Sequence, residues 1–451
     1  MLHHEITNLL RDELAPATGC TGPTAYALAA AACRAYVTGD IRHFRVYVSP
    51  AYLKIGFGVA TPGTSTPGIE IAAAAGFVAG DPARGMQVLQ PVTAADLERA
   101  HSLCAQGRLS VHSAPEQKGV YVRCEIETSR ETVVSVVSHT HDGLCLVQVN
   151  GADVFRADPS ALPDRIENHP DSLSLSDIFQ YARTCTLDET GFLLEGYRIN
   201  RALAEDGIRG AYGLGTGRAL LLRALDRQPA PSDLLQDPLH DLPASIEMQS
   251  LILVCGACDG RMGGSRLPAM AAMGDGNQGL TLLLPLGVAG HALGKSDLET
   301  ARAMALGALI LFYIKMRIGR ASAMCLCALA SAAGVAAGYG ALRGLSERQI
   351  EGAVKNVLSP LAGMLCDGAK NACALKMSVA VSTALRAVDW AALDVQPGYY
   401  DGLCDDSLEQ TVHIITQVTN QTMEMLDRCM VNAILHKAPP DAQQRKEMDR
   451  P

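Results

Sequence analysis

The feature that most restricts the fold is a stretch of 22 uncharged residues from Ala321 to Leu342, ASAMCLCALASAAGVAAGYGAL. A helix needs roughly 20 apolar residues to cross a bilayer, so the length would be sufficient. However, Ala, Gly, Ser and Cys dominate the stretch and Leu occurs only three times, a composition that suits close packing inside a protein better than contact with lipid. The stretch therefore predicts a buried helix, with a membrane span as the alternative.

Composition limits the partners that the chain is expected to bind. Its 451 residues are enough for two or three domains, and the net charge of −9 is spread along the chain. The sequence shows no basic patch, which excludes nucleic acid as the main partner. The N-terminal segment MLHHEITNLLRDEL lacks the apolar run and cleavage site of a signal peptide. We therefore expect a cytoplasmic protein with no membrane partner.

The hydrophobic pattern changes along the chain and predicts an α+β fold. Residues 1–40 have helical spacing interrupted at GCTGP, and these helices are expected to pack on the helical domain of residues 173–436. Residues 41–165 contain short alternating runs such as FRVYVS and TVVSVVSH between helical stretches, which indicates an α/β domain. Residues 173–436 have a helical period almost throughout, and 438–451 is expected to be a disordered tail.

The helical half carries recognisable start signals and glycine-rich turns. SDLE at Ser296 and SERQ at Ser346 are typical of capping boxes. The segment 258–281, CDGRMGGSRLPAMAAMGDGNQGLT, contains six glycines. Its GDGNQG turn could present backbone N–H groups to an anion at the start of the next helix. A plain connection between two helices explains the pattern equally well.

Fourteen cysteines are many for a chain in a reducing compartment, where they do not form a disulfide framework. Cys255 and Cys258 form a CxxC pair, which alone is a weak indication of zinc or dithiol chemistry. A zinc ribbon needs a second pair at similar spacing, and none follows. We interpret this pair as buried structural thiols.

Cys325 and Cys327 lie two residues apart. On one helix such residues point about 200° away from each other, so only one of them is expected to face a shared site.

Cys366 and Cys373 lie seven residues apart in GMLCDGAKNACALK. On a straight helix they would be about 10 Å apart, too far for one small metal centre. The Asp367-Gly368 pair is a strong turn signal that could bring both sulfurs together. Three such thiolates suit an iron–sulfur cluster in which one iron lacks a protein ligand. Three buried, unligated thiols are the alternative.

Several segments, in this order, together resemble the L-cysteine desulfidase family, which is related to the α-chain of iron–sulfur L-serine dehydratases. They are ATGCTGPTAYALAAA, VYVSPAYLKIGFGVATPGT, GIEIAAAAGFVAGDP, DGRMGGSRLPAMAAMGDGNQGLT, GRASAMC and GMLCDGAKNACALKMS. The resemblance covers nearly the whole chain outside the tail. It implies a [4Fe-4S] cluster held by Cys325, Cys366 and Cys373, and leaves Cys327 as a packing residue.

The resemblance also implies a lyase that eliminates hydrogen sulfide or water from a small β-thiol or β-hydroxy α-amino acid, giving a 2-oxo acid and ammonia. Cys20 and Lys54 are the expected catalytic residues, with Cys20 acting as a base or as a reversible fourth ligand. The expected substrate-binding residues include backbone donors for the carboxylate. They are Thr21, Gly63, Thr64, Asn277, Gln278 and Lys370.

Three positions depart from the family pattern. Gly22 replaces the glutamate of Gly-Cys-Thr-Glu-Pro, Ile55 replaces the asparagine of Lys-Asn-Gly, and Asp275 stands in the loop before Asn-Gln-Gly. Because hydrogen bonds to one group can discriminate strongly between substrates, an altered substrate is plausible. The alternatives are a non-catalytic descendant that uses the fold for binding or sensing, and zinc chemistry at the CxxC pair. A homo-oligomer is possible in either case.

Overall fold

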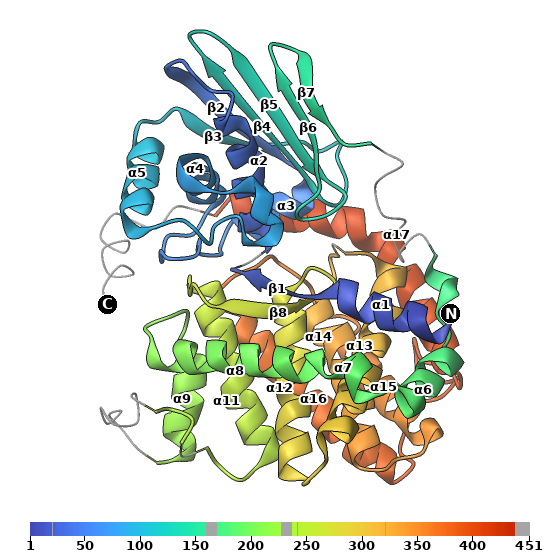
Figure 1. The fold of residues 1–451 in the computed structure, drawn as a ribbon. Helices are drawn as coiled ribbons and strands as arrows, with labels where there is room; N and C mark the ends of the chain where they lie inside the picture. The colour runs from blue at the N-terminus through green and yellow to red at the C-terminus, as the bar shows by residue number, and fades with distance from the viewer. Residues whose placement is uncertain (20, 159–168, 227–236, 241, 321, 438–451) are drawn as a thin grey trace.

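The structure is a computed structural model. It describes residues 1–19, 21–158, 169–226, 237–240, 242–320 and 322–437. A sheet domain lies above a helical domain (Figure 1), which confirms the predicted α+β class. The tail expected at 438–451 lies outside the described residues, as does 159–168 at the end of the expected α/β domain.

The sheet domain is built on six strands in the order β3-β2-β4-β5-β6-β7. Their bounds are β2 (Ile41–Val48), β3 (Leu109–Ser113), β4 (Tyr121–Thr128), β5 (Thr132–Ser138), β6 (Leu144–Val149) and β7 (Ala152–Arg156). β2 and β3 are parallel, and the other pairs are antiparallel. Along β4, buried residues alternate with half-buried ones, because one face of the sheet covers a core.

Helices cover that inner face. They are α2 (Thr21–Arg34), α4 (Ile69–Ala79) and α5 (Ala94–Ala105), with α3 (Pro50–Gly56) and the 3-10 helix η1 (Pro82–Gln87) beside them. The crossover from β2 to the parallel strand β3 contains α3, α4 and α5, as a parallel pair requires. Gly76 of α4 allows close contact with α2, since a Cβ there would lie 2.2 Å from the carbonyl oxygen of Ala27.

The two N-terminal helices pack on different domains, which corrects the expectation for residues 1–40. α1 (His3–Glu13) buries Ile6 and Leu10 in the core of the helical domain. α2 instead belongs to the core of the sheet domain, because its Ala-rich surface is apolar on all sides and fits between α4 and the sheet.

A two-stranded sheet lies between α1 and α2 and was not predicted. β1 (Leu14–Thr18) pairs antiparallel with β8 (Pro268–Ala272). Neither LAPAT nor PAMAA is rich in β-branched or aromatic residues, so their strand form comes from the pairing of distant segments rather than from propensity.

The helical domain surrounds α14 (Leu326–Leu342), which is buried as predicted and packs against α12, α13, α15 and α16. Its small residues permit this: a Cβ on Gly334 would lie 2.4 Å from the carbonyl oxygen of Gly307 on α13. None of the described helices is long and apolar enough to span a membrane. The capping boxes at Ser296 and Ser346 are present as predicted.

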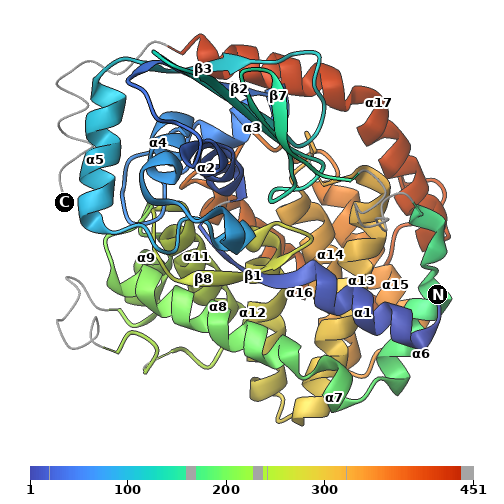
Figure 2. The same cartoon turned by 45° about the horizontal axis from the view of Figure 1, so that its top comes forward.

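The other elements of this domain complete its layer (Figure 1). They are η4 (Pro170–Ser172), α6 (Leu175–Thr184), α7 (Leu187–Thr190), α8 (Phe192–Arg209), α9 (Thr216–Ala224), α11 (Ile246–Met262), α12 (Gly276–Ala292), α13 (Asp297–Ile318), α15 (Glu347–Leu361), α16 (Cys373–Ala392) and α17 (Leu408–Leu435). α17 runs beside both domains, contacting α13 and α15 of one and α3 of the other (Figure 2).

Candidate functional site

A cavity of about 90 Å³ lies between the two domains. The helical domain contributes the end of α11 and the starts of α12, α14 and α16, while the sheet domain contributes α3 and the turn before β6. We call it the sulfur cavity, because four cysteines line it: Cys325, Cys327, Cys366 and Cys373.

The turn predicted at Asp367-Gly368 brings Cys366 and Cys373 to the same cavity. Gly368 has φ +99, and a Cβ there would lie 2.1 Å from the carbonyl oxygen of Lys54, so the position requires glycine. α16 begins at Cys373, directly after the turn.

A short backbone pairing joins this turn to the segment before α14. The N–H of Cys325 donates to the carbonyl of Met364 at 2.8 Å, and the N–H of Cys366 donates to the carbonyl of Ala323 at 2.7 Å. The structure therefore brings together Cys325, Cys366 and Cys373, the three residues expected to be ligands.

Cys327 also faces the sulfur cavity, which corrects its interpretation as a packing residue. Cys325 is the N-cap of α14 with extended backbone (φ −75, ψ 91), so the two cysteines do not share one helix. The thiol of Cys327 donates to Oδ2 of Asp275 at 3.5 Å. The 200° separation expected for two residues on one helix does not apply, because α14 begins one residue after Cys325.

The thiols differ in acidity. The thiol of Cys327 lowers the pKa of Cys325 to about 7 when its one S–H is turned toward the sulfur of Cys325 in place of Asp275. Desolvation raises the pKa of Cys366 against the opposing charge of Lys54, and raises the pKa of Cys373 to about 12 against that of Lys370. Binding a metal would release protons from these thiols, and the neighbouring cations favour the thiolate form.

Arg261, in the last turn of α11, is the most informative residue that sequence reasoning missed. It is 2% exposed. Its Nε donates to the carbonyl of Gly19 at 3.1 Å and its Nη1 to Oδ1 of Asn277 at 2.9 Å. Nη2 is buried and has no partner in the described part of the chain. A Cβ on Gly276 would lie 2.3 Å from Nε, so that glycine makes room for the guanidinium.

A buried guanidinium with an unused donor is suited to an anion. In the sequence, the one feature that could have pointed to Arg261 is its position as a single arginine between glycines at the end of an apolar helix.

The start of α12 does not offer the N–H groups of Asn277 and Gln278 to an anion, so of the two alternatives for GDGNQG the structure favours the plain connection. Asp275 is the N-cap, and its Oδ1 accepts from the N–H of Asn277 at 2.9 Å and of Gln278 at 3.4 Å. Lys315 and Arg261 outweigh the effect of burial and lower the pKa of Asp275, so this carboxylate occupies the anion position.

The side chains of Asn277 and Gln278 still reach the sulfur cavity. The amide Nε2 of Gln278 donates to Oδ2 of Asp275 at 3.2 Å, which fixes the orientation of the amide. Its carbonyl Oε1 is buried without a partner among the described residues.

Both lysines expected at the site line the sulfur cavity. Nζ of Lys54 forms an ion pair with Asp427 at 2.6 Å and contacts the carbonyl of Ser322 at 3.5 Å. Nζ of Lys370 forms an ion pair with Asp367 at 2.5 Å, and Lys376 pairs with the same carboxylate. These pairs hold cations beside the thiols.

Gly63 and Thr64 are not brought to the sulfur cavity. They line a separate pocket of about 380 Å³ with Arg266 and Tyr212. The N–H of Gly63 is already used, since it donates to the carbonyl of Gly264 at 2.7 Å.

Cys20 lies outside the described residues, and Thr21 begins α2. Gly22 and Ile55 are complementary in shape: a Cβ on Gly22 would lie 2.6 Å from Cγ2 of Ile55. The two departures from the family pattern are therefore linked, because the isoleucine fills space that a side chain at position 22 would need.

His141, in the turn between β5 and β6, was also missed. It is 7% exposed and lines the sulfur cavity from the sheet domain. Burial, with the positive charges of Lys315 and Arg320, lowers its pKa to about 3. The ring is therefore neutral at physiological pH.

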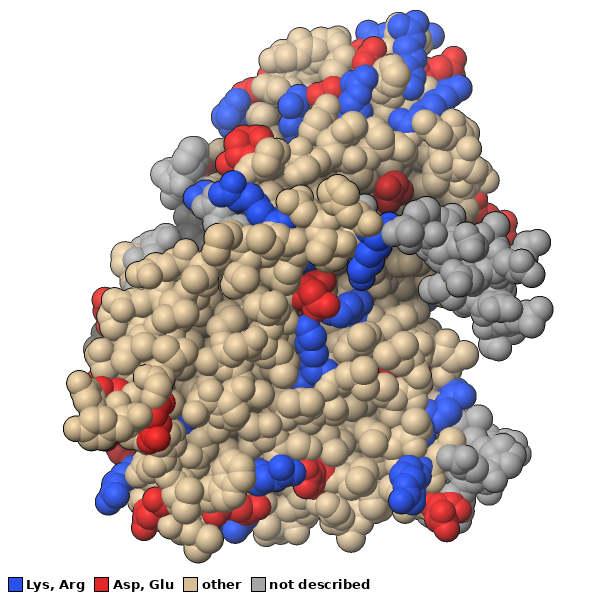
Figure 3. Space-filling view, turned by 180° about the vertical axis from the view of Figure 1, so that it is seen from behind, with Lys and Arg blue, Asp and Glu red and all other residues tan. Residues whose placement is uncertain are grey.

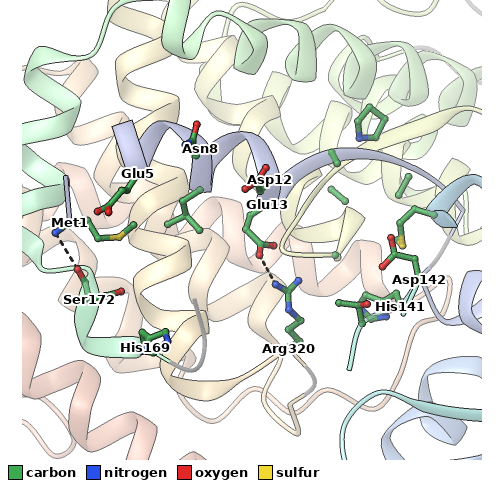
Figure 4. Close-up of a pocket in the computed structure, with 18 residues that line it drawn as sticks. Met1, Glu5, Asn8, Asp12, Glu13, His141, Asp142, His169, Ser172 and Arg320 are labelled. Carbon is green, nitrogen blue, oxygen red and sulfur yellow. Dashed lines mark hydrogen bonds and ion pairs between the residues drawn. The ribbon is translucent and has the colours of Figure 1, made fainter. Parts of the chain in front are cut away.

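A second cavity, of about 820 Å³, adjoins the sulfur cavity through His141 and Arg320, which line both. We call it the vestibule. Figure 4 shows α1 along one wall with Glu5, Asp12 and Glu13. Glu13 forms an ion pair with Arg320 at 2.6 Å.

Elsewhere, Lys and Arg lie among Asp and Glu on the face drawn in Figure 3.

Comparison with known proteins places the chain in a family. The family model described as serine dehydratase alpha chain matches residues 83–432. A UPF0597 protein of Oleidesulfovibrio alaskensis is 33% identical over 436 residues, covering 96% of this chain and 98% of that protein. A UPF0597 protein of Clostridioides difficile is 30% identical over 94% of this chain and 98% of its own length. The UPF0597 protein YhaM of Salmonella gallinarum is 32% identical, covering 95% and 96%. The chain therefore belongs to the serine dehydratase alpha-chain family.

Proposed function

We propose that this protein is an iron–sulfur-dependent lyase that eliminates hydrogen sulfide or water from a small β-thiol or β-hydroxy α-amino acid. The observation that carries the proposal is the arrangement in the sulfur cavity. Three thiols expected as ligands line the same small space as the unpartnered Nη2 of Arg261. The first group suits a metal cluster, and the second suits the carboxylate of a substrate.

The donor set fits a [4Fe-4S] cluster better than a single metal ion. In the described ranges, no group of three or more His, Cys, Asp or Glu side chains is placed to hold one ion. A cluster requires a different geometry. Each cysteine binds its own iron, so the ligand sulfurs can lie farther apart than around a single ion. In the proposal Cys325, Cys366 and Cys373 are these ligands, with Lys54, Lys370 and Lys376 balancing the negative charge of thiolates.

A cluster held there would supply an iron that acts as a Lewis acid toward the leaving group. The chain itself recognises the rest of the substrate. Nη2 of Arg261 donates to the substrate carboxylate, and Oε1 of Gln278 accepts from its ammonium group. Both atoms are buried without other partners in the described residues, so a zwitterion would satisfy both.

The proposal assigns the remaining steps to Cys20 and Lys54. In the proposal Cys20 removes the Cα proton, and the carbonyl of its neighbour Gly19 is held by Arg261 at the sulfur cavity. Two of the three N–H donors of the Lys54 ammonium group contact Asp427 and Ser322. The third can donate to the negative charge that develops on the substrate when its Cα proton is removed. Loss of the proton and the β-substituent gives a 2-aminoacrylate, which water converts into a 2-oxo acid and ammonia.

Anaerobic purification followed by product analysis tests the proposal. We expect about four iron and four sulfide per chain, and release of pyruvate and ammonia from L-cysteine or L-serine. A chain that holds the cluster but turns over neither these nor close homologues would be a binding or sensing descendant. Stoichiometric zinc in place of iron would contradict the cofactor assignment.

The linked pair Gly22 and Ile55 provides a test of substrate choice. Gly22→Glu alone is expected to clash with Ile55, so the informative variant is Gly22→Glu with Ile55→Asn. We expect the double variant to shift the ratio of kcat/KM toward L-cysteine. The single variant Ile55→Asn is the control. An unchanged ratio in the double variant would show that these two positions do not determine which substrate is preferred.

A further inference from the structure

His141 reaches the sulfur cavity from the opposite domain. It lies in the turn between β5 and β6, where His139 has φ +67. Figure 4 shows His141 beside Arg320 in the lining of the vestibule, and both residues also line the sulfur cavity. The turn therefore delivers one imidazole from the sheet domain to a site built mainly by the helical domain.

The imidazole is held in place on two sides. Its Nδ1 is hydrogen-bonded to the hydroxyl of Tyr52, and the two rings are stacked with centroids 5.8 Å apart. Tyr52 is itself anchored, since the hydroxyl of Tyr26 donates to its carbonyl at 2.5 Å. On the other edge lies Gly274, where a Cβ would come within 2.6 Å of Cδ2 of His141. Nε2 makes no hydrogen bond to any residue that the structure describes.

The charges around the ring explain what it can do. Lys315, Arg320 and Arg261 contribute positive charge and Asp275 negative charge, and with burial they keep the imidazole neutral. The Tyr52 hydroxyl and Nδ1 can share their hydrogen bond in either direction, and in the tautomer in which Nδ1 accepts from the hydroxyl the neutral ring carries its proton on Nε2. It is then a hydrogen-bond donor with a fixed direction, and it adds no further charge to a site that is already rich in cations.

We propose that His141 is a substrate-binding residue whose Nε2–H donates to a carboxylate oxygen of the substrate held by Arg261. A carboxylate offers about four lone-pair sites. Arg261 already donates from Nε to Gly19 and from Nη1 to Asn277, and its Nη2, unpartnered among the described residues, supplies at most two N–H donors, so lone-pair sites remain for a further donor. The sheet domain thus completes the substrate site of the helical domain, and Tyr52 is a positioning residue that fixes the tautomer. This inference rests on the proposed lyase function.

The test compares variants that keep or remove the donor. His141→Gln places an amide N–H near the position of Nε2, whereas His141→Ala removes it. L-alanine is the probe, because it has the carboxylate and ammonium groups but no leaving group, and its inhibition constant reports binding alone. We expect His141→Ala to raise this constant and KM about 10- to 100-fold, the range for a hydrogen bond to a charged group.

The same contact predicts the inhibition constants of the other variants. His141→Gln should stay within about threefold of the unmodified protein, and Tyr52→Phe should fall between the two. The iron content should be the same in all of them. His139→Gln, in the same turn but exposed, is the matched control and should bind L-alanine normally.

Two results would overturn the inference. Equal inhibition constants in His141→Ala and the unmodified protein would show that the ring does not touch the substrate. Loss of the ascending limb of the pH–rate profile in His141→Gln would show that the ring acts as a base. If the unmodified protein turns over no substrate, the proposed function fails. Saturable L-alanine binding that weakens only in His141→Ala and Tyr52→Phe would then still support the contact.

Discussion

Two regions of this protein that contain several cysteines differ in the backbone that carries them. Cys255 and Cys258 lie inside α11 and are buried, with the thiol of Cys255 donating to the carbonyl of Ala374 at 3.6 Å. Cys325, Cys366 and Cys373 lie at a helix start or beside the Gly368 turn and line a cavity. Regular helix buries sulfur against neighbouring helices, whereas helix ends and turns leave sulfur facing open space.

The charges differ in the same way. Desolvation raises the pKa of Cys258 well above its usual value, and the thiols and carboxylate beside it oppose ionisation further. The sulfur cavity instead has five cationic side chains in its wall. They are Lys54, Arg261, Arg320, Lys370 and Lys376. Cysteine spacing alone therefore does not distinguish a thiol that lines a cavity from one packed between helices, but the neighbouring backbone and charge do.

The largest expected difference between the two regions is in iron binding. Cys373→Ala should abolish the bound iron and its visible absorption, because the cavity would lose one of three sulfur ligands. Cys258→Ala is the matched control and should retain iron. Iron and sulfide counts after anaerobic purification measure both. Equal iron content in the two variants would show that the cavity cysteines and the pair in α11 do not differ in iron binding.

The second test concerns the end of α11, where the proposed carboxylate-binding residue Arg261 follows the buried pair Cys255 and Cys258. Arg261→Met should raise KM about 100-fold, because a charge-assisted hydrogen bond to the substrate carboxylate is lost. Its iron content should stay normal. Arg266→Met is the control, since Arg266 lines the pocket of Gly63 and Thr64. A larger rise in KM for Arg266→Met would move the carboxylate site to that pocket.

Acid should lower the free energy of unfolding, because His141 is buried in its neutral form. The pKa of His141 is about 3 in the folded protein and about 6.5 in an unfolded chain. Between these values the unfolded chain binds more protons, so stability is complete above about pH 6.5 and is lost as the pH falls. By pH 5 the free energy of unfolding should decrease by about 2 kcal/mol from this group.

Denaturant unfolding at pH 7 and pH 5 measures that difference. His141→Gln should lose less stability over this interval than the unmodified protein, and the exposed His139→Gln should not differ from it. Parallel curves for all three proteins would mean that His141 is not buried as described.

The smallest effect is expected inside α11. Cys258→Ser buries a hydroxyl, which can bond back to the carbonyl four residues earlier in the helix, so the free energy of unfolding should fall by about 1 kcal/mol. The substitution should leave KM and iron unchanged. Cys429→Ser, at an exposed position on α17, should change neither stability nor activity. A loss of iron in Cys258→Ser would give the CxxC pair a role at the site.

Much of the fold could be predicted from local pattern. The alternating runs became strands, and the helical stretches between them became α4 and α5. The prediction failed at β1 and β8, whose sequences carry no strand signal and which pair across more than 200 residues. It also failed for α2, since an Ala-rich helix can pack equally well on either domain.

The sequence by itself determined the buried helix α14, its neighbours' capping boxes and the Gly368 turn, because these depend on residues close together in the chain. Tertiary structure alone decided that Nη2 of Arg261 has no partner among the described residues, that His141 comes from the other domain, and that Cys327 faces the cavity. Each of these facts depends on contacts between distant segments. Hydrophobic period and residue spacing report only local geometry, so they could not show which polar atoms remain without partners.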